Sequence, residues 1–136
     1  MRVLFMYKPL SIRLLAVLIV TLACVQGAAT YWDLYFYVWW LDVPMHLFGG
    51  FWISAATITF LLTKHAGSAG NSWSTLLGHA LLATIVIGAG WELFEWSVDR
   101  LNGLIHFDVA DTSADMLNDT IGALCAAWIL LRKKKV

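Results

Sequence analysis

Four long apolar segments constrain the fold of this chain more than any other feature. They cover residues 10–29, 43–63, 75–96 and 110–131, and each is close to the roughly 20 residues that an α-helix needs to cross a bilayer. Of the 136 residues, 60% are hydrophobic, which is more than a typical soluble domain contains. We therefore predict an all-α fold, a polytopic membrane bundle of four transmembrane helices that forms a single domain over residues 1–136.

Opposite charges lie at opposite ends of these segments. The acidic residues fall at or near one set of ends, whereas the basic residues other than Arg100 fall at the other set. Because short cytoplasmic loops retain Lys and Arg, both termini are predicted to be cytoplasmic and the carboxylates to face outward. The basic run at residues 132–135 suits contact with anionic lipid, and no face of the chain suits nucleic acid.

Three local features complete this picture. The first segment has an alternative interpretation as a cleaved signal peptide, with basic residues before it and small residues at its end. This alternative leaves the orientation of the other segments unchanged.

Residues 31–41 are rich in Tyr and Trp and are predicted to be an outer interfacial anchor or, alternatively, a platform for a lipid or glycan. Cys24 and Cys125 lack metal-site or redox spacing and are predicted to be buried free thiols.

The fourth segment carries an acidic stripe. Asp111, Asp115 and Asp119 recur every four residues, so they lie on one side of a helix. The distance from Asp111 to Asp119 along the helix axis is about 12 Å. Asp108 is a predicted N-cap, and Asp111 suits the first helical turn. Capping does not explain the two deeper aspartates, since an intramembrane carboxylate costs about 3 kcal/mol. A proton, a cation or facing donors must compensate them.

The second and third segments place ionisable groups at the same depth. Asp42 suits the cap of the second helix, His46 lies one turn further on the same side, and the third helix ends with Glu92 and Glu95. Glycines that permit close helix approach flank these groups: Gly49, Gly50, Gly88, Gly90 and Gly122. The histidines His65, His79 and His106 are weaker candidates because they lie in or near loops.

We predict that ionisable groups from three helices converge near the outer face. The predicted ligands of a divalent cation (Mg, Mn, Ca or Zn) are His46, Glu92, Asp115 and Asp119. Glu95 or Asp111 is the candidate general base on a bound water. The same carboxylates could instead hold protons, because like charges in a low-dielectric site raise one another's affinity for a proton.

The motifs at these positions resemble those of a known group. They read Asp42-x-x-x-His46-x-x-Gly49-Gly50, Trp91-Glu92-x-x-Glu95 and Asp111-x-x-x-Asp115-x-x-x-Asp119-x-x-Gly122. Together they resemble the small YjdF-type membrane proteins and are more distantly similar to VanZ-like proteins. The resemblance covers about residues 42–126 and implies a multi-pass protein of the bacterial cytoplasmic membrane, without an established activity. VanZ-like proteins are associated with glycopeptide-antibiotic tolerance, which implies chemistry on the envelope at the outer face.

Three functions are compatible with the sequence. The leading hypothesis is a metal-dependent hydrolase or transferase that acts on an envelope lipid or cell-wall precursor; the chain has no Ser/His/Asp signature, nucleophile elbow or phosphate loop. The second is a proton- or cation-coupled transporter that uses Asp119, with a homo-oligomer building the pore. The third is an accessory subunit whose acidic stripe pairs with a basic helix of another protein. The sequence leaves the choice of enzyme or transporter open.

Overall fold

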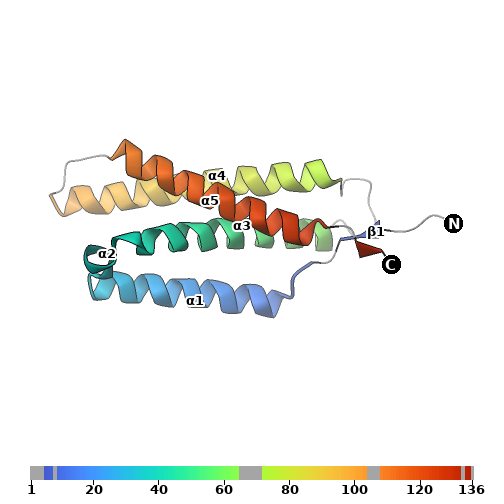
Figure 1. The fold of residues 1–136 in the computed structure, drawn as a ribbon, viewed down its shortest axis with the longest axis horizontal. Helices are drawn as coiled ribbons and strands as arrows, with labels where there is room; N and C mark the ends of the chain where they lie inside the picture. Colours follow the sequence, from blue (N-terminus) through green and yellow to red (C-terminus); the bar gives the residue numbers. More distant parts are fainter. Residues whose placement is uncertain (1–4, 8, 65–71, 104–107, 133, 136) are drawn as a thin grey trace.

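Four long helices dominate the computed structural model, which describes residues 5–7, 9–64, 72–103, 108–132 and 134–135. They are α1 (Ile12–Tyr31), α3 (Asp42–Lys64), α4 (Trp73–Leu101) and α5 (Val109–Leu130), and they run back and forth along one long axis (Figure 1). The short helix α2 (Leu34–Tyr37) and the 3₁₀ helix η1 (Trp39–Leu41) connect α1 to α3. Two-residue strands, β1 (Phe5–Met6) and β2 (Lys134–Lys135), pair antiparallel and bring the two ends of the chain together. The predicted all-α class is confirmed.

Three stretches in the described part of the chain are long and apolar enough to cross a membrane. They are Ile12–Tyr31, Trp39–Lys64 and Trp73–Leu101, which correspond to α1, η1 with α3, and α4. Helix α5 has 22 residues, but Asp115, Asn118 and Asp119 lower its mean hydropathy. Three of the four predicted spans are therefore long and apolar enough to cross a membrane. The fourth, α5, does not meet the same criterion because of its polar residues.

The α3–α5 pair is the most tightly packed part of the bundle. A Cβ atom added at Gly50 would lie 2.6 Å from the backbone carbonyl carbon of Asp119, and one added at Gly122 would lie 2.8 Å from the backbone nitrogen of Phe51. The Ser54 hydroxyl donates a hydrogen bond of 3.0 Å to the carbonyl oxygen of Ala123. Glycine is thus required on both helices because their backbones touch.

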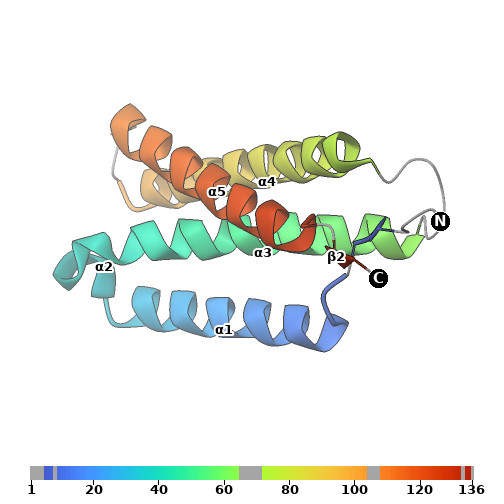
Figure 2. The same ribbon diagram turned by 45° about the vertical axis from the view of Figure 1, so that its right-hand side comes forward.

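Helix α1 lies on the opposite side of α3 from α4 and α5, as both views show (Figure 1, Figure 2). The Trp52 indole donates a 2.7 Å hydrogen bond to the carbonyl oxygen of Leu15, and the amide of Leu10 donates one of 3.1 Å to Thr59 Oγ1. Only Leu15 and Ala29 of α1 are buried. Most of the surface of α1 is therefore turned away from the other helices.

The two cysteines correct one prediction. Both are free thiols, as expected, but Cys24 on α1 and Cys125 on α5 are exposed at the protein surface. The predicted burial was wrong because an apolar position in a membrane helix can face lipid as readily as a neighbouring helix.

The two ends of the bundle differ in charge and in aromatic content. Arg13, Lys64 and Arg132 lie at the end that holds the termini, whereas α2 and η1 lie at the other end (Figure 1). The aromatic segment is open: Phe36 is 83% exposed and Trp39 80% exposed, as an interfacial anchor requires. Residues 65–71 between α3 and α4, which include His65, lie outside the described residues, and so does His106.

Candidate metal centre

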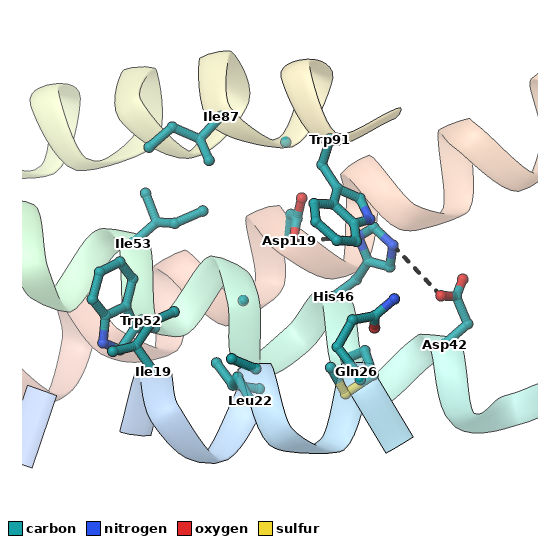
Figure 3. A pocket seen from close by; sticks show the side chains of 15 residues that line it. Ile19, Leu22, Gln26, Asp42, His46, Trp52, Ile53, Ile87, Trp91 and Asp119 are labelled. Carbon is teal, nitrogen blue, oxygen red and sulfur yellow. Dashed lines mark ion pairs between the residues drawn. The ribbon is translucent and has the colours of Figure 1, made fainter. Parts of the chain in front are cut away.

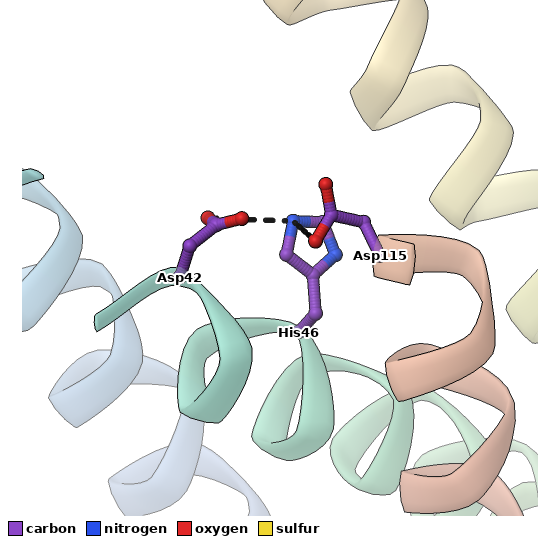
Figure 4. Close-up of side chains that lie close together, drawn as sticks. All are labelled: Asp42, His46 and Asp115. Atoms are coloured by element: carbon purple, nitrogen blue, oxygen red, sulfur yellow. Dashed lines mark ion pairs between the residues drawn. The ribbon is translucent and has the colours of Figure 1, made fainter. Parts of the chain in front are cut away.

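His46 stands at the centre of a cluster of carboxylates. It lies in the second turn of α3, whose first turn accepts Pro44 because the amide of that position has no helical partner. The imidazole is buried, and its Nε2 atom lies 3.6 Å from Asp42 Oδ1, 3.9 Å from Glu92 Oε1 and 3.9 Å from Asp115 Oδ1. Figure 4 shows Asp42 and Asp115 approaching the ring from two different helices. One nitrogen atom thus faces oxygen atoms from α3, α4 and α5.

Asp119 faces the other nitrogen of the same ring. Its Oδ1 atom lies 3.5 Å from His46 Nδ1. Glycines of two helices leave room for this carboxylate, because a Cβ atom at Gly88 would lie 2.5 Å from Asp119 Oδ2 and one at Gly49 would lie 3.7 Å from Oδ1. Asp119 therefore has a separate position in the cluster, on the far side of the imidazole from the other carboxylates.

Glu92 contributes the least compensated oxygen atom of the cluster. Its side chain is 10% exposed, and Oε1 is buried without a hydrogen-bond partner among the described residues. Burying such a group unpaired costs several kcal/mol, roughly 1–3 even for a neutral one. The nearest described group that could carry a compensating positive charge is His46, whose Nε2 atom lies 3.9 Å from Glu92 Oε1. This distance is too long for a hydrogen bond. This oxygen needs a proton or a cation.

Within the described chain, no Lys or Arg neutralises the cluster. The ion pairs found there all involve His46. Arg100, the cation on the acidic end of the bundle, instead lies over the Trp96 ring at 5.2 Å. One imidazole thus faces several carboxylates: Asp42, Glu92, Glu95, Asp115 and Asp119. A single imidazolium leaves a large excess of negative charge if these groups are ionised.

The donor atoms are close enough to share a metal ion. Two groups have ligand atoms that all lie within 4.8 Å of one another: Asp42 with His46 and Asp115, and His46 with Glu92 and Glu95. An ion about 2.1 Å from each ligand holds neighbouring ligand atoms about 3 Å apart. Side-chain rotations that shorten the observed distances by about 1 Å would complete such a set. One imidazole among carboxylates suits Zn²⁺ or Mn²⁺ better than Mg²⁺ or Ca²⁺, which prefer oxygen ligands alone.

The structure brings most of the sequence-predicted residues together. His46, Glu92, Glu95, Asp115 and Asp119 form one cluster. Asp111 is exposed and belongs to neither group of candidate ligands. Four residues turn a helix by about 400°, so the acidic stripe drifts by about 40° at each step. Asp111 lies two such steps from Asp119, and the accumulated rotation, together with the rise along α5, places it at the surface.

Two predicted caps have different outcomes. Asp108 is the N-cap of α5, and its Oδ1 atom accepts hydrogen bonds from the amides of Ala110 (3.0 Å) and Asp111 (3.2 Å). Asp42 instead has helical backbone angles, with φ −62° and ψ −44°, so it is the first residue of α3 and its carboxylate faces His46. Its place in the cluster was missed, although the four-residue spacing to His46 was the signal that could have found it.

A cavity of about 520 Å³ adjoins the cluster between α1, α3 and α4. Figure 3 shows Asp42, His46 and Gln26 at one end of it and Ile53, Ile87 and Trp52 toward the other. The Tyr35 hydroxyl donates a hydrogen bond to Gln26 Oε1. Burial raises the pKa of Tyr35 to about 12, so this donor stays protonated. No sequence pattern indicated this cavity, because the sequence of an apolar helix such as α1 does not reveal which of its sides faces a cleft.

The comparisons with known proteins agree with a membrane location. A family described as "Predicted membrane protein (DUF2238)" matches residues 3–135. No curated protein and no solved structure matches the chain. The family match fits the resemblance to YjdF-type membrane proteins, whereas the distant similarity to VanZ-like proteins stays a prediction.

Proposed function

The chain belongs to the DUF2238 family of predicted membrane proteins, and on that premise we propose that it binds one divalent cation near the outer membrane face and acts on an envelope lipid or cell-wall precursor. In this proposal α5 is the fourth transmembrane helix, and both termini lie in the cytoplasm of a bacterial cell. The segregation of charge supports the orientation. The pairing of β1 with β2 supports an even number of crossings, because it holds both ends of the chain at one end of the bundle.

The observation that carries the cation is the buried oxygen of Glu92. It has no hydrogen-bond partner among the described residues, and it faces the same nitrogen of His46 as Asp42 and Asp115 do. We assign these four side chains as the ligands. A divalent ion would offset two of the three negative charges of these carboxylate ligands, which the described Lys and Arg residues leave unpaired.

Asp119 receives a role different from the one that the sequence suggested. Since it faces His46 Nδ1, it would hold the proton on that nitrogen and leave Nε2 free to bind the ion. Histidine ligands of metals are commonly oriented by a carboxylate in this way. Asp119 is therefore proposed as a positioning residue.

Glu95 is the proposed general base. It is half-buried on α4 and lies in the same group as His46 and Glu92, whereas Asp111 is exposed. In the hydrolysis of an ester in such a substrate, water attacks the central atom of the ester group and the bond from that atom to the leaving oxygen breaks. Glu95 would accept the proton of the water and return it to the leaving oxygen. The cation would offset the negative charge that develops on the other oxygen atoms of that group.

The core beyond the cluster favours an enzyme over a transporter. Toward the end of the bundle that holds the termini, the described helices enclose an apolar core that includes Ala55, Ile58, Leu62, Leu76, Ala80 and Ala126. A proton or ion moving through the membrane needs polar groups or water along its path. Among the described residues, this region holds the buried hydroxyls of Ser54, Thr59 and Thr84 but no buried acidic or basic side chain, so the transport of protons or ions through a single chain is disfavoured.

Metal binding by the purified chain tests the proposal. The protein in detergent is dialysed against Mn²⁺, Zn²⁺, Mg²⁺ or Ca²⁺, and the bound metal is measured by elemental analysis. We expect about one Mn²⁺ or Zn²⁺ per chain, and we expect Glu92→Gln to weaken binding at least about tenfold. Asp99→Asn is the matched control, because Asp99 is an exposed carboxylate on the same helix. Failure of all four ions to bind, or unchanged binding by the Glu92→Gln variant, would remove the proposal.

A further inference from the structure

The cavity beside the cluster has two chemically different ends. The outer end is bordered by Gln26, Asp42, His46 and Asp119, whereas Ile19, Ile53 and Ile87 from three helices form the walls further in. His46 and Ile53 are seven residues apart on α3, so the cavity runs at least about 10 Å along the helix axis. Trp52, held by its hydrogen bond to the carbonyl oxygen of Leu15, borders the inner part. Figure 3 shows this separation of polar and apolar side chains directly.

The direction of this cavity matches the direction of a lipid in the outer leaflet. A lipid has its headgroup at the membrane surface and its hydrocarbon chain toward the bilayer centre, and the polar and apolar ends of the cavity follow the same order along α3. The volume of about 520 Å³ lies within the range of about 300–1,000 Å³ that is typical of small-molecule sites with apolar walls and a few polar groups. A small polar metabolite would leave the apolar walls uncovered.

The charge of the cluster selects the headgroup. Carboxylates alone would repel a phosphate, whereas a divalent ion bound by them would accept a phosphate oxygen as a further ligand. Gln26 adds a donor: because its Oε1 atom accepts from Tyr35, its amide nitrogen is the free end, and Figure 3 shows this side chain beside His46 and Asp42. The headgroup that fits these neighbours is a phosphate, held by the ion and by an amide N–H.

We infer that the cavity between α1, α3 and α4 holds one hydrocarbon chain of a phosphate-bearing lipid, with the phosphate at the His46 cluster. This inference rests on the proposed cation and names the substrate class for it. It also makes a specific demand: the lipid binds only when the ion is bound, since the same carboxylates repel phosphate in the absence of the ion.

Gly27 offers a direct way to block the cavity. It lines the cavity, and a Cβ atom added there would meet no other heavy atom within 4 Å. Leucine at this position would therefore add bulk to the cavity wall without a clash at its Cβ atom. Gly78 on α4 is the matched control, because a Cβ atom there also meets nothing within 4 Å and Gly78 does not border the cavity.

The experiment uses the full chain in detergent and a photoreactive alkyl phosphate, with labelled residues mapped by mass spectrometry. With Mn²⁺ or Zn²⁺ present, we expect labelling of cavity residues such as Ile53 and Ile87, and at least about tenfold less labelling when the ion is removed with a chelator. Gly27→Leu should reduce labelling to a similar extent, whereas Gly78→Leu should label like the wild type. Inorganic phosphate should compete at least about tenfold less well than a non-reactive alkyl phosphate.

The outcomes separate the inference from the proposed function. Suppose that the ion binds equally to the wild type and to Gly27→Leu, but the extent of labelling is unchanged in Gly27→Leu or after the ion is removed. The lipid inference is then overturned and the cation proposal stands. If no ion binds, the cation proposal fails and the inference falls with it. Should Gly27→Leu fail to fold, Ile87→Trp provides a second way to fill the cavity from α4. Equal labelling by a photoreactive alkyl glucoside would contradict the phosphate assignment.

Discussion

At the scale of single residues, the two nitrogens of His46 divide the carboxylates into two classes. Nε2 faces Asp42, Glu92 and Asp115, and Nδ1 faces Asp119. An imidazole has one donor nitrogen and one acceptor nitrogen when it is neutral. A carboxylate at Nδ1 favours the proton there, so that Nε2 presents its lone pair to the other three side chains.

This division predicts different effects of two neutralising substitutions. We expect Asp119→Asn to weaken metal binding by about 10- to 100-fold, the range typical of residues that orient a metal ligand. We expect Asp111→Asn to leave the affinity within about twofold, because Asp111 is exposed and outside the cluster. The measurement is a titration of the purified variants with Mn²⁺ or Zn²⁺. Equal losses in both variants would show that charge alone, and not position at Nδ1, determines the affinity.

The residue scale also shows how far the sequence could predict the site. The four-residue spacing of Asp115 and Asp119 and the shared depth of His46 and Glu92 were sufficient to predict a cluster. Asp42 was missed because a helix cap and a site residue have the same sequence signature, and only its backbone angles separate them. Asp111 was included because spacing alone does not show how far a stripe of residues has turned away from a fixed neighbour.

At the scale of the helices, the α3–α5 contact holds the cluster in place. Gly50 and Gly122 are in contact with the backbone of the opposite helix, and both lie within one turn of a cluster residue: Gly50 is four residues after His46, and Gly122 is three after Asp119. Such contacts leave no space for a methyl group. The same packing that stabilises the bundle therefore sets the distance between His46 and the carboxylates of α5.

We predict that Gly50→Ala destabilises the protein by about 1–3 kcal/mol, because the added methyl group meets backbone atoms that cannot move aside. Gly78→Ala is the control, since a Cβ atom there meets nothing and alanine is the better helix former by about 1 kcal/mol. Reversible unfolding of the two variants in mixed detergent measures both effects. The prediction is contradicted if Gly50→Ala is as stable as the control.

Helix positions could be predicted from apolar length, but helix faces could not. The predicted segments overlap α1, α3, α4 and α5, since a run of about 20 apolar residues leaves few alternatives. The sides that pack were not evident, because lipid-facing and protein-facing positions are both apolar. This is why the exposure of Cys24 and the cavity along α1 were found only in the structure.

At the scale of the whole molecule, opposite ends of the bundle carry opposite charges. Arg13, Lys64 and Arg132 lie at the end with the termini, and the cluster lies near the other end. Two of these side chains lie over aromatic rings, Lys64 5.5 Å from the centre of the Phe60 ring and Arg132 4.3 Å from that of Trp128. This arrangement is what an outward-facing cluster and cytoplasmic termini require.

The proposed orientation predicts which positions a membrane-impermeant thiol reagent can reach in intact cells. In a variant with Cys24→Ser and Cys125→Ser, we expect Trp39→Cys to be labelled from outside, because Trp39 is 80% exposed in the aromatic segment. Lys64→Cys should be labelled only after the cells are permeabilised. The reverse pattern would place the cluster on the cytoplasmic side, and the envelope assignment would then be withdrawn.

Helix α1 borders the cavity but supplies none of the proposed ligands, and it meets the bundle chiefly through α3. In the proposed site the ion is therefore held without α1, whereas this helix supplies one wall of the cavity and the Gln26 amide. Substitutions in α1 would then change which amphiphile the proposed cavity accepts, while the proposed ion ligands on α3, α4 and α5 stay in place. Chimaeras in which only α1 is replaced should therefore keep the same metal affinity, while the length of the lipid hydrocarbon chain that they prefer changes.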